Sequence, residues 1–407
     1  MHILVLNPGS SSLKVSMYEA GPSQRDPRML YDGELGGIGG ETSFELHAAD
    51  GTDLLHGTKQ AKAATLHDAI GSVLAAVSVS GMPAIEAVGY RVVHPGPKLT
   101  DHQRITPEVM RELEAAIPFA PLHDPAAIEL IRAVMQNLPG ITHFACFDTI
   151  FHQTMPIEAT TYALPQSIRD QGVRRYGFHG LSCESVVHQL RAQGKLPQRM
   201  IMAHLGSGSS VTAMVDGRSV DTTMGLTPTG GIVMGTRPGD LDPGVMLYLL
   251  RQQAGDKAAA LCDVEAMLNH ASGMVALSGL PNDVKAMRKA AAEGDAHATL
   301  ALRVFTRSVT KAIGGFCWLL GGVDAIVFSG GIGEHDALTR AEVLAGLGGL
   351  GIALDETFNQ PRTSGIRRIS AAGSSVAAYV VPADEDRMIA RHVIARHVAR
   401  MALPPQD

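Results

Sequence analysis

Short apolar runs followed by polar loops rich in glycine and serine recur along the chain. Residues 3–6 are apolar and lead into the loop 7–12, after which residues 14–18 alternate between apolar and polar positions. A short apolar run bounded by turn residues predicts a strand, and period-two alternation predicts a half-buried strand. The N-terminal segment is therefore predicted to be a hairpin.

A second segment repeats this plan about half a chain length later. Residues 200–204 are apolar, residues 206–210 form a Gly/Ser turn, and residues 211–215 are again strand-like. The repeat predicts two related domains, although two Gly/Ser hairpins can also match by chance. A further strand, residues 325–328, runs into a glycine-rich loop at 329–334.

Helices are predicted between these strands. Thr106 and Pro107 have the residue types of an N-cap and a first helical position, and Asp124 with Pro125 starts a second helix in the same way. Residues 300–320 predict a long helix, and acidic residues 384–386 open a C-terminal one. Strands mixed with helices indicate an α/β chain.

Composition and charge narrow the class of function. The chain has 407 residues, 44 of them glycine, where average usage predicts about 28. The net charge is −6 without a block of Lys or Arg, which argues against nucleic acid or an anionic membrane surface as partner. The charge therefore favours small-molecule ligands. The sequence has no apolar run long enough to predict a membrane span. The four cysteines form no CxxC pair, so we expect the protein in the reducing cytoplasm.

The loop 7–14 has the residue types of a phosphate site. Backbone N–H groups around Gly9, three hydroxyls and the ammonium of Lys14 can surround one anion. The Walker order GxxxxGK[ST] is absent, and an ordinary polar hairpin turn is the alternative. Similar loops at 204–210 and 330–334 favour the phosphate interpretation.

A denser cluster of charged residues lies in the middle of the chain. Asp148 follows an apolar stretch, residues 174–180 hold two arginines and a histidine beside glycines, and Arg237 lies in the glycine-rich segment 230–240. Cations near a phosphate loop are what a transferring phosphoryl group requires, because its charge spreads over the equatorial oxygens. Each of these residues taken singly could equally have a surface or packing role.

Together these segments resemble the acetate kinase family, within the acetate and sugar kinase/Hsp70/actin superfamily. The matching segments occur in the family's order and span nearly the whole chain: 7–14, 91–94, 120–123, 147–156, 174–180, 204–206, 234–244 and 331–334. The resemblance implies an α/β fold of two duplicated actin-like (ribonuclease H-like) ATPase domains around a central cleft, in a homodimer. The implied domains are residues 1–150 with 384–407, and residues 151–383, the latter binding the nucleotide.

The resemblance also implies an activity and its residues. The reaction is reversible, Mg²⁺-dependent (or Mn²⁺-dependent) in-line phosphoryl transfer from ATP to acetate or another short-chain carboxylate, giving ADP and acetyl phosphate. The implied catalytic residues are Asp148, His179 and Arg237. The implied acceptor site consists of Arg91, Val93, Leu122, His123, Phe178 and Pro228. The implied donor and phosphate site consists of Ser10, Ser12, Lys14, His204, Leu205, Gly206, Ser207, Gly208, Asp283, Val284, Lys285, Gly331, Ile332, Gly333, Glu334 and His335, and the implied metal ligands are Asn7 and Glu385.

This chemistry is physically reasonable for a carboxylate acceptor. The acceptor is already ionised at pH 7, so it needs no strong general base. Its difficulty is electrostatic, because an anion must approach a polyanion, and Arg91, His179 and Arg237 with Mg²⁺ would supply the positive charge. Asp148 is then better suited to orient water on the metal than to act as an acid or base.

Departures from the family pattern leave some choices open. The family usually has Asn at Ser207, Arg at Lys285, Asn at His335 and Thr-Asn-Glu-Glu at residues 383–386. Most of these lie on the nucleotide side, so another nucleotide or pyrophosphate stays open as donor. Propionate or butyrate stays open as acceptor, because one methylene is worth only about 1–3 kcal/mol. A nucleotide-driven switch is the alternative from another class, and it would need no site for an acceptor carboxylate.

Overall fold

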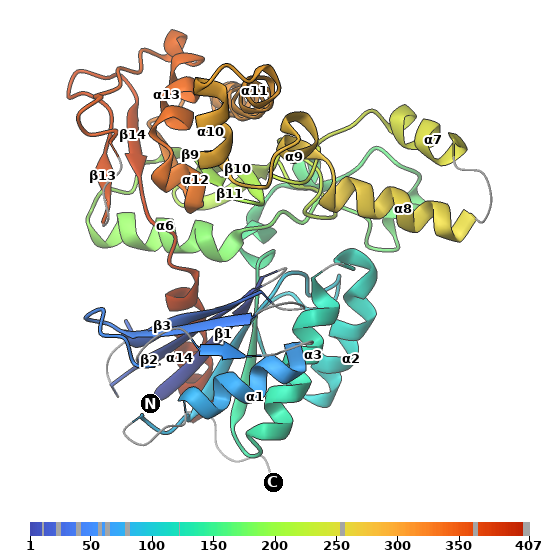
Figure 1. Cartoon of the computed structure of the whole chain (residues 1–407), viewed down its shortest axis with the longest axis vertical. Helices are drawn as coiled ribbons and strands as arrows, with labels where there is room; N and C mark the ends of the chain where they lie inside the picture. The colour runs from blue at the N-terminus through green and yellow to red at the C-terminus, as the bar shows by residue number, and fades with distance from the viewer. Residues whose placement is uncertain are drawn as a thin grey trace. The chain divides into compact units, whose positions relative to one another are not determined.

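Two β-sheets, each in its own unit, organise the computed structural model of this chain (Figure 1). The units are Met1–Ile150 with Asp384–Asp407, and Phe151–Ala383. The structure describes residues 1–9, 12–21, 26–37, 42–55, 59–61, 66–77, 82–121, 123–252, 257–360 and 365–401. Two predicted site residues, Ser10 and Leu122, lie outside the described residues.

The sheet of the first unit has the order β5-β4-β3-β2-β1-β6-β8-β7. Its strands are β1 (His2–Pro8), β2 (Ser12–Glu19), β3 (Arg28–Gly36), β4 (Thr42–Ala48), β5 (Lys59–Ala61), β6 (Ala87–Val92), β7 (Gln103–Arg104) and β8 (Thr142–Phe147). β1 and β2 form the predicted antiparallel hairpin, in which Asn7 pairs with Lys14. β1, β6 and β8 run parallel, so their carboxyl ends share one edge of the sheet.

Helices cover both faces of this sheet. They are α1 (Leu66–Val77), α2 (Pro107–Ala116), the 3-10 turn η1 (Ile117–Phe119), α3 (Asp124–Asn137) and α14 (Glu385–Met401). The predicted cap forms at α2, where Thr106 Oγ1 accepts from Val109 N at 3.3 Å. At α3 the cap prediction is wrong, because His123 is the N-cap residue and Asp124 is already the first helical residue. Val88 belongs to the core beneath α1–α3, whereas a Cβ at Gly89 would lie 2.6 Å from Ile389 of α14. Because successive strand residues point to opposite faces, α14 covers the other face.

The sheet of the second unit has the order β11-β10-β9-β12-β14-β13. Its strands are β9 (Arg199–Leu205), β10 (Ser209–Val215), β11 (Arg218–Thr222), β12 (Ala325–Ser329), β13 (Arg367–Arg368) and β14 (Ala377–Val380). The run β11-β10-β9-β12-β14 has the same antiparallel and parallel pairings as β3-β2-β1-β6-β8 in the first unit. This shared topology confirms the predicted α/β class with a duplicated unit.

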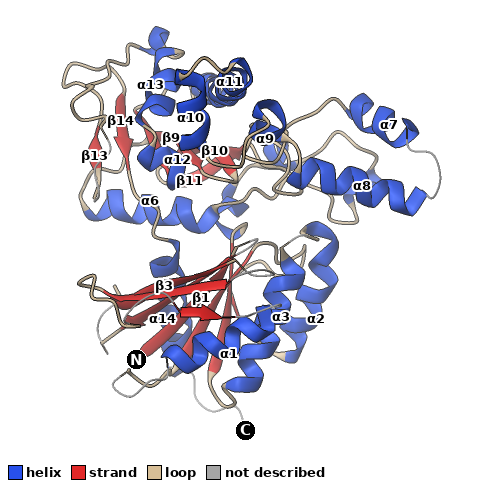
Figure 2. Cartoon of the chain, in the orientation of Figure 1, coloured by secondary structure: helices blue, strands red, loops and turns tan. Residues whose placement is uncertain are grey.

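Helices of the second unit also lie on both faces of its sheet (Figure 2). They are α4 (Ile157–Thr160), α5 (Gln166–Arg169), α6 (Gly180–Ala192), α7 (Pro243–Gln252), α8 (Lys257–His270), α9 (Gly273–Ser278), α10 (Val284–Ala292), α11 (Ala296–Leu319), α12 (Gly330–His335) and α13 (Ala337–Ala345), with the 3-10 turns η2 (Ile150–Thr154) and η3 (Gly348–Leu350). Met200 and Met202 pack with α6, while Ile201 and Ala203 pack with α9–α11 and α13. The long helix predicted at 300–320 is α11.

The segment after β12 differs from the expected loop. Residues Gly330–His335 form the short helix α12 instead. Gly330 has a φ of 75°, which turns the chain sharply out of the strand, and a Cβ there would lie 2.7 Å from Leu205 O. Glycine permits both this backbone conformation and this close approach.

Candidate functional site

Three predicted residues of the first unit meet where the parallel strands end. Asn7 is the next-to-last residue of β1, Arg91 lies near the end of β6, and Asp148 lies directly after β8. Arg91 donates to Asp148 Oδ2 from Nε at 2.9 Å and from Nη2 at 2.5 Å. Its Nη1 donates to Asn7 Oδ1 at 3.4 Å. Ligands of open α/β sheets are bound at such carboxyl edges.

Carboxylates surround this guanidinium. Glu385, the first residue of α14, lies 3.8 Å from Arg91 Nε. The next residue, Asp386, accepts from Asn7 Nδ2 at 2.9 Å and from Ser16 Oγ at 2.6 Å. Burial raises the pKa of Asp386, and the hydrogen bonds from Ser16 and Asn7 oppose this rise. Asp386 therefore has both oxygens engaged, and it ties the last helix to the first hairpin.

Asp148 is 1% exposed, and its Oδ1 is a buried atom without a hydrogen-bond partner among the described residues. Burial raises its pKa, while the positive charge of Arg91 opposes the rise and the negative charge of Glu385 adds to it. Three carboxylates thus share one guanidinium, with the exposed Lys14 acting at longer range. Hard divalent cations take oxygen ligands. The residues present therefore fit Mg²⁺, with Asn7, Glu385 and Asp148 as the candidate oxygen donors.

Some of the residues implied for the acyl group lie close in the chain to this cluster. Val93 follows β6 and is buried, and His123 is the N-cap residue of α3. The next residue, Asp124, is also buried and accepts from His94 N at 3.3 Å. Burial raises the pKa of Asp124 to about 8, and backbone hydrogen bonds from His94 and Val93 oppose that rise. Sequence reasoning assigned Asp124 only to a helix start, because nothing in the local pattern signals its burial.

In the second unit, two histidines meet beside the β9–β10 turn. His179 is the N-cap residue of α6, and His204 lies near the end of β9. Their rings stack with centroids 4.2 Å apart and planes 23° apart. His179 Nδ1 bonds to Ser210 Oγ at 2.9 Å, and His204 Nδ1 to Ser182 Oγ at 2.8 Å. Neither serine was predicted as a site residue.

Arg237 lies near the same turn. A Cβ built on Gly208 would lie 3.4 Å from both Arg237 Nη1 and His179 Nε2. Arg237 also donates from Nη1 to Pro228 O at 3.0 Å, so Pro228, another predicted residue, lies beside Arg237. The absent side chain of Gly208 therefore leaves backbone accessible between a guanidinium and an imidazole, an arrangement suited to an anionic phosphoryl group. Phe178, the residue before His179, is fully buried.

A cavity of about 490 Å³ lies next to this turn, between α10 and α12. Seven predicted residues line it: Ser207, Asp283, Val284, Lys285, Gly331, Ile332 and His335. Four residues that were not predicted complete the lining: Asn282, Arg288, Asp336 and Leu338. Asn282 Nδ2 donates to Ser207 Oγ at 2.8 Å, so the serine at this departure from the family pattern has its own hydrogen-bond partner.

Three of the predicted nucleotide residues support the cavity without lining it. Glu334 accepts from Gly330 N and from Ala383 N, each at 3.0 Å. Gly333 is buried, and a Cβ there would lie 3.5 Å from Phe328 C. Leu205 is fully buried in the core. These residues shape the segment after β12 and the end of β9 through packing and hydrogen bonds.

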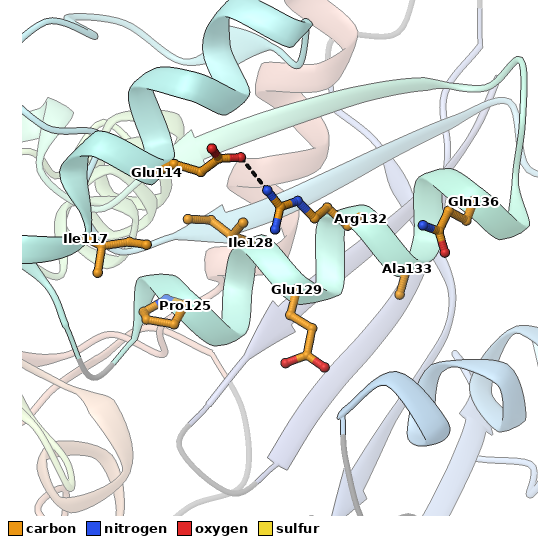
Figure 3. A pocket seen from close by; sticks show the side chains of 8 residues that line it. All are labelled: Glu114, Ile117, Pro125, Ile128, Glu129, Arg132, Ala133 and Gln136. Carbon is orange, nitrogen blue, oxygen red and sulfur yellow. Dashed lines mark hydrogen bonds and ion pairs between the residues drawn. The ribbon is translucent and has the colours of Figure 1, made fainter.

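A second cavity, of about 280 Å³, lies between α2 and α3 of the first unit (Figure 3). Its lining comprises Glu114, Ile117, Pro125, Ile128, Glu129, Arg132, Ala133 and Gln136. Arg132 Nη2 and Glu114 Oε1 pair at 2.5 Å across it, and both side chains are exposed. None of the residues that line it is a predicted site residue, and they offer no cluster of catalytic groups.

Comparison with known proteins identifies the family of the chain. A model of the acetokinase family matches residues 2–391. The chain belongs to this family. An acetate kinase of Deinococcus radiodurans is 44% identical over 398 residues, covering 96% of this chain and 97% of its own. One of Rhodopseudomonas palustris is 41% identical over 401 residues, covering 96% and 97%.

Solved structures of the family have the same fold. A crystal structure of Porphyromonas gingivalis acetate kinase has a TM-score of 0.83 at 34% identity, covering 97% of this chain and 99% of its own. A Francisella tularensis propionate kinase has a TM-score of 0.86 at 34% identity, covering 96% and 98%. The predicted family is therefore confirmed, and with it the enzyme class of an acetate kinase. Among the described helices, none combines the length and hydropathy needed to cross a bilayer.

Proposed function

We propose that this chain catalyses the reversible, Mg²⁺-dependent transfer of the γ-phosphoryl group of ATP to acetate by direct in-line attack, giving ADP and acetyl phosphate. The observation that carries the proposal is the position of Arg91 in a chain of this family. Its guanidinium lies at the carboxyl edge of the sheet, held by Asp148 and next to Asn7. A nucleotide-driven switch has no use for such a site, which suits a carboxylate substrate.

The first unit would bind the acceptor and the metal. Arg91 would pair with the acetate carboxylate, while Val93 and His123 would line the space for its methyl group. Asn7 and Glu385 would hold Mg²⁺, and Asp148 would orient its water through Oδ1. Bound there, the ion would neutralise phosphate charge and polarise phosphoryl oxygens. The position of Asp148 against Arg91 suits such an orienting role better than proton transfer, since acetate needs no base.

The second unit would bind the donor. Gly206 and Gly208 expose the backbone of the β9–β10 turn to the phosphates, and His179 with Arg237 would stabilise the charge that develops on the transferring group. The cavity between α10 and α12 would hold the nucleoside, with Asp283 and Lys285 at its wall. Lys285 presents an ammonium without the planar fork of arginine, so it stacks less well on a base.

A donor and acceptor matrix tests this proposal. The protein would be assayed with ATP, GTP or pyrophosphate against acetate, propionate or butyrate, with hydroxylamine trapping the acyl phosphate. We expect acyl hydroxamate with the highest kcat/KM for the ATP and acetate pair. Preference for propionate would match the name of the Francisella relative. Preference for pyrophosphate would assign the departures at Ser207, Lys285 and His335 to donor choice. Nucleotide hydrolysis without hydroxamate would reject the kinase in favour of a switch.

We also propose a homodimer in the cytoplasm. Helix α7 has no buried residue, although several of its side chains are large and apolar. Val245, Leu247 and Tyr248 are 41%, 52% and 60% exposed. An apolar helix left so exposed is typical of a protein interface, and a second copy of the chain would cover it. All four cysteines are free thiols, three of them buried, as is usual in a reducing compartment.

A further inference from the structure

Two reciprocal histidine–serine hydrogen bonds join the N-terminus of α6 to the β9–β10 hairpin. α6 brings His179 as its N-cap residue and Ser182 in its first turn, while the hairpin brings His204 and Ser210, which pair with each other in the strand register. Each histidine bonds through Nδ1 to the serine of the other element, at 2.9 Å and 2.8 Å. Both serines are at most 1% exposed, so water does not compete for these bonds.

The opposite ring nitrogens face the glycine positions of the proposed phosphate site. A Cβ on Gly208 would lie 3.4 Å from His179 Nε2, and a Cβ on Gly330 would lie 3.1 Å from His204 Nε2. His179 reaches this position with a φ of 57°, a left-handed conformation that a residue with a side chain adopts at a cost. Backbone strain of this kind is often kept where it positions a functional group.

A third histidine of the same unit shows which ring tautomer accompanies a serine at Nδ1 and an oxygen at Nε2. His152 is buried, with Nδ1 bonded to Ser219 Oγ at 2.9 Å and Nε2 to Phe178 O at 2.8 Å. A carbonyl oxygen can only accept, so the proton of the neutral ring lies on Nε2. Nδ1 is then an acceptor, and the Ser219 hydroxyl donates to it. The Phe178 carbonyl thus fixes the Nε2–H tautomer, and the Ser219 hydroxyl complements it by donating to Nδ1.

We propose that Ser210 and Ser182 are positioning residues that hold His179 and His204 as neutral Nε2–H donors to the phosphate oxygens of the donor. The inference rests on the proposed function, because the phosphate oxygens of the donor would accept from Nε2 of each ring, as Phe178 O accepts from His152 Nε2. Two positive charges on rings 4.2 Å apart would repel each other, so neutral donors suit the stacked pair. The positive charge comes from Arg237, whose Nη1 is near the same Gly208 position as His179 Nε2.

Removing one hydroxyl tests the role. In Ser210→Ala, the neutral ring of His179 is no longer held in the Nε2–H form, whereas a protonated ring carries that hydrogen in any case. We therefore expect kcat to fall about tenfold or more at high pH, with the deficit shrinking as the pH is lowered. The KM values for ATP and acetate should change little. Ser182→Ala should behave alike through His204, and Ser210→Thr should restore the wild-type pH profile because it retains a hydroxyl.

Ser185→Ala is the matched control. Ser185 lies on α6 with the same burial, and its Oγ accepts from Gln189 Nε2 at 3.0 Å. We expect this variant to keep the wild-type kcat and pH profile. Equal losses in Ser182→Ala and Ser185→Ala would assign the serines a purely structural role. A pH-independent loss in Ser210→Ala would also overturn the inference.

A spectroscopic measurement on the wild-type protein makes the result independent of activity. Long-range ¹⁵N–¹H spectra of the histidine-labelled wild-type protein distinguish the two neutral tautomers. Signals that disappear in His179→Asn and His204→Asn identify the two rings. We expect both as Nε2–H tautomers above neutral pH, and an Nδ1–H tautomer at either ring would overturn the inference. Absence of hydroxamate with the wild-type protein would instead reject the proposed function.

Discussion

Asn7 and Asp386, 379 positions apart in the chain, are joined by a hydrogen bond of 2.9 Å from Asn7 Nδ2 to Asp386 Oδ1. The bond fixes which way the Asn7 amide faces, because its nitrogen is directed to the carboxylate. Asn7 Oδ1 is consequently turned to the side of Arg91 Nη1, 3.4 Å away. The amide oxygen of Asn7 is thus presented within the same cluster as Asp148.

Asp386→Ala should weaken Mg²⁺ binding, because Asn7 loses the acceptor that orients its amide. Partners that orient metal ligands typically contribute about 10–100-fold in affinity. We expect a loss in that range when Mn²⁺ binding is followed by electron paramagnetic resonance. Asp384→Ala is the control, since Asp384 pairs with Arg387 at 2.7 Å instead of with Asn7. Unchanged Mn²⁺ affinity in Asp386→Ala would contradict the orienting role.

Arg237→Ala should lower kcat by roughly 10³-fold or more, as expected for an arginine that stabilises a transferring phosphoryl group. The variant also loses the hydrogen bond to Pro228 O, so its folding should be checked by circular dichroism. Arg218→Ala removes an exposed arginine of β11 and should leave kcat unchanged. A loss of less than about tenfold in Arg237→Ala would reject the proposed role.

Asp124→Asn should stabilise the protein at neutral and mildly alkaline pH. Burial raises the pKa of Asp124 from 3.8 to about 8, so folding favours its protonated form. The contribution of Asp124 to stability is therefore fully present below about pH 4 and is lost as the pH rises towards 8. Asparagine cannot ionise and retains an oxygen for His94 N. The gain in Tm should be small at pH 4 and grow up to pH 8, and a constant gain would contradict this assignment.

Tyr248→Glu on α7 should convert the proposed dimer into a monomer, because it places a charge on the apolar surface that a second copy would cover. Light scattering after size-exclusion chromatography measures the mass. Leu300→Glu on α11 is the control, since Leu300 is 52% exposed on another helix. A wild-type protein of 42.9 kDa mass at micromolar concentration, or a Tyr248→Glu dimer, would argue against this interface.

Local patterns predicted the elements that depend on neighbours in sequence. The two hairpins with Gly/Ser turns, the Thr106 cap and the long helix α11 all occur where apolar periodicity and cap residues placed them. The segment after β12 was predicted as a loop and is the helix α12. Its glycines suggested a phosphate-binding loop, whereas Gly330 serves the close approach to Leu205 O. Periodicity cannot register such a contact, because it is made with another strand.

The site residues also fall into those that the sequence predicted and those that it did not. His179 and Arg237 stood out in the sequence because charges beside glycines signal anion chemistry, whereas Arg91 was named through the family resemblance. Ser182, Ser210, Asp124 and Asp386 did not stand out, since a serine or an aspartate acquires a role only from the group that it meets. Asp386 reaches Asn7 only because α14 packs on β1 and β2.

The order of residues alone was enough to determine the α/β class, the repeated hairpin and the family, because each depends on local periodicity or on ungapped motifs. Tertiary structure decided which hydroxyl faces which imidazole, which carboxylate is buried and which amide is held in one orientation. These properties depend on distances and burial between segments far apart in the chain, and hydrogen-bond and electrostatic energies change steeply with both.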